Sequence, residues 1–185
     1  MARARKSGGG FGSFVVGFVI ALVLAAGTVF VYFQFGTPPV AVVDPPFPFE
    51  KNIVRLPLNA RIDRELKQPP FGTSEDVFEA GARVYRNDCA SCHGTPGHDV
   101  PLAAHMYPVA PQLWKKHSHG NVVGVSDDSP GETYWKVENG IRLTGMPAFR
   151  HLLSDAQMWQ VSLLLKSADQ PLPDPVMQIL TNPKL

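Results

Sequence analysis

The most constraining feature of the sequence is a long stretch without any charged residue, between Lys6 and Asp44. Within it, residues 11–35 form an apolar run that is interrupted only by glycine, serine, threonine and glutamine. As a helix this run would extend roughly 37 Å, which exceeds the ~30 Å hydrocarbon core of a bilayer. We therefore predict a transmembrane helix at residues 11–35, with a modest tilt.

Charges around this run predict its orientation. Residues 1–10 carry Arg3, Arg5 and Lys6 and no acid, so the positive-inside rule places this basic tip in the cytoplasm. A cleaved signal peptide is the alternative, because residues 25–27 (Ala-Ala-Gly) are a passable cleavage site. The apolar run continues past that point, where a mature protein would turn polar, so the pattern favours a retained anchor. In both cases the remaining chain is exported.

A proline-rich segment follows the apolar run. Five prolines between residues 36 and 50 disfavour helix and central strand, and they favour a stiff, extended polyproline II spacer. Residues 59–67 could form a short polar helix that ends before Pro69 and Pro70. We predict residues 36–72 as an extended linker with this possible helix, of open role.

Both cysteines of the chain lie in one segment, Cys89-Ala90-Ser91-Cys92-His93. The pattern C-x-x-C-H is the attachment signature of c-type haem. On a helical turn, the two thiols can add to the vinyl groups along one porphyrin edge. His93 then lies under the iron as its proximal ligand. The motif predicts one covalently attached haem c.

Three other interpretations of this motif are weaker. A thioredoxin-like dithiol requires a strand before the motif and a helix after it, whereas here a predicted helix precedes and Gly94, Pro96 and Gly97 follow. A structural zinc site requires a second ligand pair, and the chain has no further cysteine. A disulfide across two residues would be strained and would leave His93 unexplained.

A helix is predicted directly before the motif, with Thr73 as its N-cap and acidic residues in its first turn. It carries Gly81 and Tyr85 at helical spacing on one face. In these features the sequence resembles class I cytochrome c of the membrane-anchored bacterial type. The resemblance covers about residues 73–168. It departs from the family in residues 98–129, a long stretch rich in glycine, proline and histidine.

A sixth iron ligand is expected downstream, and Met146 is preferred for its context. Ser129 begins a capping box for a helix that ends at Gly140, and a loop framed by glycine and proline then carries Met146. Residues 139–149 resemble the axial-methionine loop of the family. His105 and Met106 are the alternative ligands, whereas Met158 lies within a predicted helix and suits core packing. Weaker candidates are His98, His117, His119, His151 and Met177.

The resemblance implies two further features. A proline carbonyl after the motif accepts the free N–H of the proximal histidine, and Pro111 matches that position, with Pro108 as an alternative. A last helix, from the capping box at Ser154 to about Lys166, crosses the first helix near Gly81 and Tyr85, with Trp159 as the aromatic partner. Trp114 is a candidate for the haem edge. Residues 171–185 are predicted to be a loosely packed, proline-rich tail.

We therefore predict an all-α, cytochrome c-like haem domain at residues 73–170, with an N-terminal transmembrane helix and a proline-rich linker. Ligation by histidine and methionine leaves no open iron position, which indicates an electron carrier rather than an enzyme acting on a small-molecule substrate. Residues 7–185 and the haem domain are slightly acidic, which argues against nucleic-acid binding.

The predicted partners are redox proteins or membrane redox complexes on the periplasmic face of the bacterial cytoplasmic membrane. A fixed subunit of a larger redox complex is the alternative, and a haem-based gas sensor or enzyme with a labile sixth ligand is the least favoured hypothesis.

Overall fold

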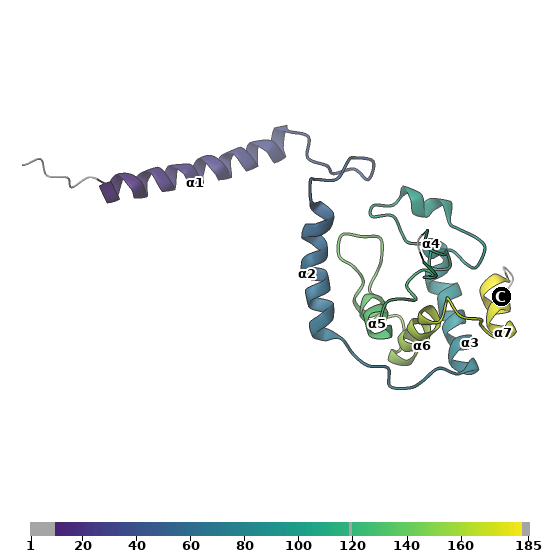
Figure 1. The fold of residues 1–185 in the computed structure, drawn as a ribbon. Helices are drawn as coiled ribbons and strands as arrows, with labels where there is room; N and C mark the ends of the chain where they lie inside the picture. The colour runs from purple at the N-terminus through teal and green to yellow at the C-terminus, as the bar shows by residue number, and fades with distance from the viewer. Residues whose placement is uncertain (1–9, 119, 183–185) are drawn as a thin grey trace, which may run out of the picture. The chain divides into compact units, whose positions relative to one another are not determined.

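The computed structural model describes residues 10–118 and 120–182, and the chain separates into two compact units, Met1–Phe47 and Pro48–Leu185. The basic tip with Arg3, Arg5 and Lys6 lies outside the described residues, as does His119. Every regular element in the described part of the chain is helical (Figure 1). The all-helical architecture predicted from the sequence is confirmed.

The first unit contains the predicted apolar helix, α1 (Gly10–Phe35). All its side chains are exposed, and its length and hydropathy suffice to cross a membrane. An N-terminal signal sequence would satisfy the same criteria. After α1 the chain is irregular as far as residue 49, where Asp44 accepts hydrogen bonds from the amides of Val40 and Ala41. This irregular course agrees with the proline-rich sequence.

The core of the second unit is formed by α3 (Glu75–Val84), α5 (Pro130–Asn139), α6 (Asp155–Lys166) and α7 (Asp174–Thr181), which Figure 1 shows gathered together. Helix α3 crosses α6 at Gly81, where an added Cβ would lie 2.5 Å from the carbonyl oxygen of Gln160. The predicted crossing of the two helices at this glycine is therefore present. Only a residue without a side chain permits so close an approach.

Helix ends follow the capping signals in the sequence, with one shift. The side chain of Ser74, not Thr73, caps α3 by accepting from the amide of Val77. Ser129 caps α5, and Ser154 forms the full predicted capping box with Gln157 at the start of α6. At α3 both candidate caps are adjacent hydroxyl residues, so composition did not distinguish them.

The aromatic partners differ from the prediction. Trp159 stacks on Tyr134 of α5, with ring centroids 4.1 Å apart and an interplanar angle of 17°. Tyr85 instead meets Trp114 edge to face, at 5.6 Å and 89°. The prediction that Trp159 pairs with Tyr85 is wrong, because Trp159 lies on the side of α6 that packs against α5.

The segment expected to be mostly extended contains a long helix, α2 (Glu50–Glu65). The short helix predicted at residues 59–67 is therefore wrong in its bounds, and it belongs to the second unit. The sequence obscures this helix because Pro57 lies inside it and no side chain caps its start. Packing compensates: Ile62 is only 2% exposed, and α2 lies against α5.

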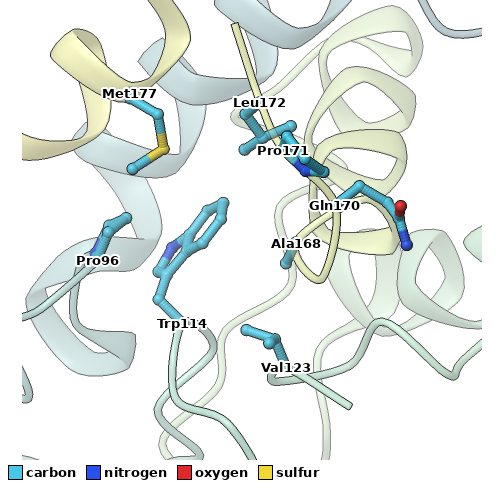
Figure 2. A pocket seen from close by; sticks show the side chains of 8 residues that line it. All are labelled: Pro96, Trp114, Val123, Ala168, Gln170, Pro171, Leu172 and Met177. Carbon is cyan, nitrogen blue, oxygen red and sulfur yellow. The ribbon is translucent and has the colours of Figure 1, made fainter. Parts of the chain in front are cut away.

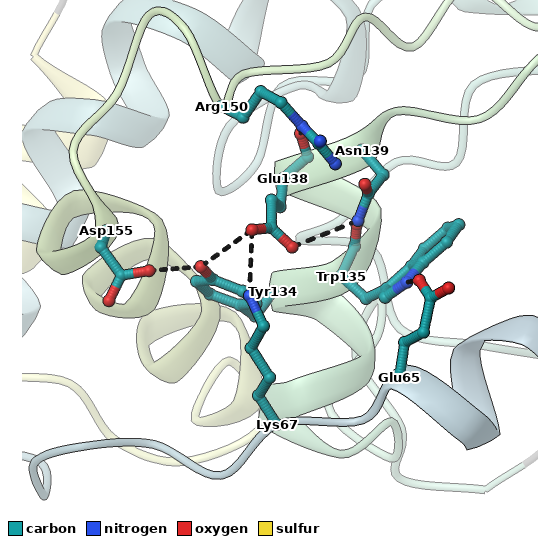
Figure 3. Close-up of polar contacts among 8 residues, drawn as sticks. All are labelled: Glu65, Lys67, Tyr134, Trp135, Glu138, Asn139, Arg150 and Asp155. Atoms are coloured by element: carbon teal, nitrogen blue, oxygen red, sulfur yellow. Dashed lines mark hydrogen bonds and ion pairs between the residues drawn. The ribbon is translucent and has the colours of Figure 1, made fainter.

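Polar contacts join the end of α2 to α5 (Figure 3). The indole N–H of Trp135 donates to Glu65 at 2.7 Å, and the Lys67 ammonium lies 3.0 Å from the carboxylate of Glu138. The same ammonium lies over the ring of Tyr134, 4.9 Å from its centroid. We call these contacts the α2–α5 clasp.

The predicted tail is not loosely packed over its described residues, 171–182, which corrects the expectation drawn from its prolines; residues 183–185 lie outside the described residues. Helix α7 begins directly after Pro173, and Pro175 lies in its first turn, where a missing N–H has no helical partner to lose. Val176, Ile179 and Leu180 repeat at helical spacing and are buried against α3.

Candidate haem site

The C-x-x-C-H motif follows α3 without a break. A π-helical turn, η1 (Tyr85–Cys89), ends at the first cysteine, and the short helix α4 (Ala90–His93) carries Cys92 and His93. Both cysteines are half-buried free thiols, and Cys89 packs against the hydrophobic core. Burial, together with the charges of Asp88 and Cys92, raises the pKa of Cys89 to about 12.

His93 is held in a defined orientation by one backbone group. Its Nδ1 lies 2.7 Å from the carbonyl oxygen of Pro111, and because a carbonyl can only accept, Nδ1 carries the proton and donates. Burial lowers the pKa of His93 despite the opposing effect of this hydrogen bond, so the imidazole is neutral at pH 7. Its Nε2 therefore carries a free lone pair, as a metal ligand requires.

Further hydrogen bonds restrain the backbone of the motif. The Tyr85 hydroxyl donates to the carbonyl of Gly94 at 2.7 Å and approaches that of His93 at 3.2 Å. The side-chain amide of Gln112 donates to the carbonyl of Cys92, and the backbone N–H of Leu113 donates to that of His93. The motif and residues 110–113 thus form one connected structure.

Sequence reasoning missed the polar roles of Tyr85 and Gln112. Tyr85 was identified from its helical spacing, which signals packing but not hydrogen bonding. Gln112 lies directly after Pro111, and this adjacency was the signal available in the sequence.

Met146 lies in the loop between α5 and α6. The loop begins at Gly140, whose φ of 65° is in the left-handed region and ends the helix. The hydroxyl of Thr144 donates to the carbonyl of Ile141 and accepts from the amide of Met146, which closes the loop on itself. Met146 is half-buried and packs against the same hydrophobic core as Cys89.

The predicted site residues thus fall into two groups. Cys89, Cys92, His93 and Pro111 are joined through the motif, whereas Met146 comes from a separate loop on the same core. Two thiols, an imidazole with free Nε2 and a thioether are the donors that haem c requires, so the residues present fit this group. The described residues contain no cluster of three or more His, Cys, Asp or Glu side chains that could hold a bare metal ion.

The other candidate ligands occupy different environments. Met158 is buried within α6, as its helical position predicted. His105 ends the 3₁₀ helix η2 (Pro101–His105) and is exposed, and His117 is exposed as well. Met106 is half-buried and approaches the backbone of Gly145, next to Met146.

Trp114 packs against the same hydrophobic core as Cys89 and Met146. It lines a surface pocket with Pro96, with Leu172 of the segment before α7 and with Met177 of α7 (Figure 2). None of the motif residues Cys89, Cys92 and His93 lines this pocket. The indole packs edge-on against Tyr85, and its candidate position at the haem edge stays a prediction.

The chain matches a known protein family. The family model described as cytochrome C oxidase, cbb3-type, subunit III matches residues 76–163, from the first turn of α3 into α6. No curated protein matches the chain. The match covers the C-x-x-C-H motif, Pro111 and the loop with Met146. Residues 76–163 are therefore a cytochrome c domain of the cbb3-oxidase subunit III type, in an all-helical protein that also carries a long apolar helix near its N-terminus.

Proposed function

We propose that this protein carries one haem c, bound covalently through Cys89 and Cys92, with His93 as the proximal and Met146 as the distal iron ligand. The observation that carries this proposal is the hydrogen bond of His93 to Pro111 within a C-x-x-C-H motif of a cytochrome c domain. In this assignment Pro111 fixes the tautomer and the ring orientation of His93, and it raises the basicity of the ligating nitrogen.

Such a site transfers electrons. When bound, the haem supplies a one-electron couple, and methionine ligation raises its reduction potential. The protein residues hold both axial positions and keep the site closed to small molecules. The proposed function is transfer of single electrons between redox partners, without a substrate of its own.

The apolar helix α1 determines where this occurs in the proposal. We assign it as a retained single-pass anchor, with the haem domain on the outer face of the cytoplasmic membrane. The irregular segment of residues 36–49 links the anchor to the second unit. Tethering raises the effective concentration of the haem domain at membrane partners. Release of the holoprotein from membranes by alkaline carbonate would contradict the anchor and support a cleaved signal sequence.

A second candidate function is a fixed subunit of a larger redox complex, and the matched family favours it because that family is described as an oxidase subunit. Purification in a mild detergent distinguishes the two. A mobile carrier runs as a single polypeptide, whereas a subunit co-elutes with partners in fixed stoichiometry.

The first test of the site is a carbon monoxide difference spectrum of the reduced, purified holoprotein. A closed histidine–methionine site predicts no change for the natural protein and a large change for Met146→Ala. Met158→Leu is the matched control, because Met158 is buried within α6 and leucine removes its sulfur while keeping its volume, so the spectrum should stay unchanged. A strong change in the natural protein would contradict the Met146 assignment and favour a sensor or an enzyme.

Covalent attachment is tested separately by acid–acetone extraction of haem from the denatured protein. Haem should remain with the polypeptide, and the double variant Cys89→Ala/Cys92→Ala should release it. Extraction from the natural protein would exclude thioether bonds.

A further inference from the structure

Met106 lies in the part of the sequence that departs from the family pattern, residues 98–129. It directly follows η2, and its amide donates to the carbonyl of Ala103 at 3.2 Å. Ala103 is itself buried, at 2% exposed, and η2 packs beside α4, the helix of Cys92 and His93. Met106 is therefore presented by a segment that is fixed to the haem motif.

The start of this segment is tied to the motif by hydrogen bonds as well. The amide of Val100 donates to the side-chain oxygen of Gln112 at 2.7 Å, and the amide nitrogen of the same side chain donates to Cys92. Gln112 therefore joins the chain before η2 to the backbone of the motif. A displacement of η2 would break these bonds.

The tip of the Met106 side chain reaches the loop on which Met146 lies. A Cβ atom built on Gly145 would lie 2.3 Å from Cε of Met106. Ordinary contacts begin at 3.4 Å, so the Met106 methyl group occupies the space that a side chain at position 145 would fill. Gly145 directly precedes Met146, so this contact is one residue away from the proposed axial ligand.

The loop has a reason to need such support. Its hydrogen bonds through Thr144 are internal, and the amides of Phe149 and Arg150 tie its end to carbonyls of α5. Leu143 adopts a φ of 62°, a conformation that costs a residue with a side chain roughly 1–2 kcal/mol. Its side chain is 88% exposed, so burial of apolar surface does not offset this cost. Between its ends, the loop is held by the packing of Met146 on the core and by the contact of Met106 with Gly145.

We propose that Met106 is a positioning residue for the axial loop. Its side chain packs beside Gly145. It thereby connects the segment that is fixed to the C-x-x-C-H motif to the loop that carries Met146. This inference rests on the proposed ligation of haem iron by Met146. Residues 98–129, which depart from the family pattern, would then have a role, because they supply the contact of Met106 with Gly145.

The test compares Met106→Ala with Met106→Leu in the full-length holoprotein. Three readouts are measured: the near-infrared absorption of a thioether bound to ferric haem, carbon monoxide binding to the reduced protein, and the reduction potential. Met106→Ala removes the contact, and we expect the population with a displaced Met146 to rise about tenfold, which corresponds to about 1.4 kcal/mol. The absorption should weaken, carbon monoxide binding should increase and the potential should fall.

Met106→Leu tests whether packing or sulfur is required. Leucine has a similar volume and no thioether, so it should keep all three properties near those of the natural protein. Met177→Ala is the matched control, because Met177 is also a half-buried methionine but lies on α7 against Leu172 and Trp114. It should change none of the three readouts.

A double variant tests the geometry of the contact. Gly145→Ala alone should have a small effect, since the end of the Met106 side chain is flexible and can move aside. In the Met106→Ala background, the same new methyl group should fill the vacated space and partly restore the absorption. Additive effects of the two substitutions would contradict direct packing.

Other outcomes separate this inference from the proposed function. Unchanged readouts in Met106→Ala would overturn the inference and leave the Met146 assignment intact. The same conclusion would follow if Met106→Leu lost the three properties while Met146→Ala bound carbon monoxide as expected. If Met146→Ala keeps the thioether absorption and Met106→Leu loses it, Met106 is itself the ligand and both assignments are wrong. Absence of the absorption in the natural protein would overturn the proposed ligation, and the inference with it.

Discussion

Gly81→Ala tests the close crossing of α3 and α6. An alanine Cβ would lie 2.5 Å from the carbonyl oxygen of Gln160 and 2.8 Å from its carbonyl carbon. These are backbone atoms, so relief requires the helices to separate by up to about 0.9 Å, the difference between 2.5 and 3.4 Å. A gap of 0.5–1 Å forfeits roughly a quarter to a half of the dispersion energy of each contact.

The net effect is the balance of two terms. Overpacking of this kind costs about 1–3 kcal/mol, and contact with backbone favours the upper end. Alanine regains about 1 kcal/mol of helix propensity over glycine. We expect a net loss of about 2 kcal/mol in the free energy of unfolding, or about a 30-fold change in the equilibrium constant.

The assay is guanidinium unfolding of the detergent-solubilised holoprotein, followed by near-ultraviolet circular dichroism of the tryptophans, all three of which lie in the second unit. Gln160→Ala is the informative companion, because it removes a side chain but leaves the clashing carbonyl. It should not rescue Gly81→Ala. Equal or greater stability of Gly81→Ala, or rescue by Gln160→Ala, would refute the reasoning.

Three further predictions concern hydrogen bonding, the α2–α5 clasp and α7. Tyr85→Phe removes the donor to the Gly94 carbonyl, whereas the His93 carbonyl keeps the N–H of Leu113, and the change should lower the unfolding free energy by about 1–3 kcal/mol; an unchanged midpoint of denaturation would contradict the hydrogen bond to Gly94. The hydrogen bond from Trp135, and secondarily that from Arg61, lowers the pKa of Glu65. The contribution of the ionised Glu65 to stability is therefore present above about pH 4.3 and is lost as the pH falls through the pKa of the folded state. Amide exchange in α2 should accelerate in that pH range, and Glu65→Gln should abolish this pH dependence. Leu180→Ala removes a fully buried side chain of α7 and should cost about 2–5 kcal/mol, whereas exposed Gln178→Ala should cost almost nothing; similar effects of the two would mean that α7 is not docked.

The α2–α5 clasp changes the expected nature of the tether. The prediction of a linker over residues 36–72 allows the haem domain a long reach. With α2 packed on α5 through Ile62 and Glu65, the segment free of helix shortens to residues 36–49. A disruption of the clasp would lengthen it again.

Local signals predicted most of the helices correctly. A capping hydroxyl and a terminal glycine act within one or two turns, so Ser129, Gly140 and Ser154 marked the ends of α5 and the start of α6. The errors came where packing outweighs local preference. Pro57 lies within α2 and Pro175 in the first turn of α7, yet burial of Ile62 in α2 and of one face of α7 stabilises both helices.

The sequence alone predicts the chemistry that we propose for this protein, because the donors for a covalently held haem depend on residue type and short spacing: two thiols, the adjacent His93 and a methionine in a glycine- and proline-framed loop. It also determined the apolar helix, whose length and composition are local properties. The tertiary structure decided what distant residues do for one another. The contact of His93 with Pro111, the bonds of Tyr85 and Gln112 to the motif, the docking of α2 and α7, and the approach of Met106 to Gly145 all join segments far apart in the chain. Such contacts follow from the packing of the whole domain, which short-range patterns do not encode.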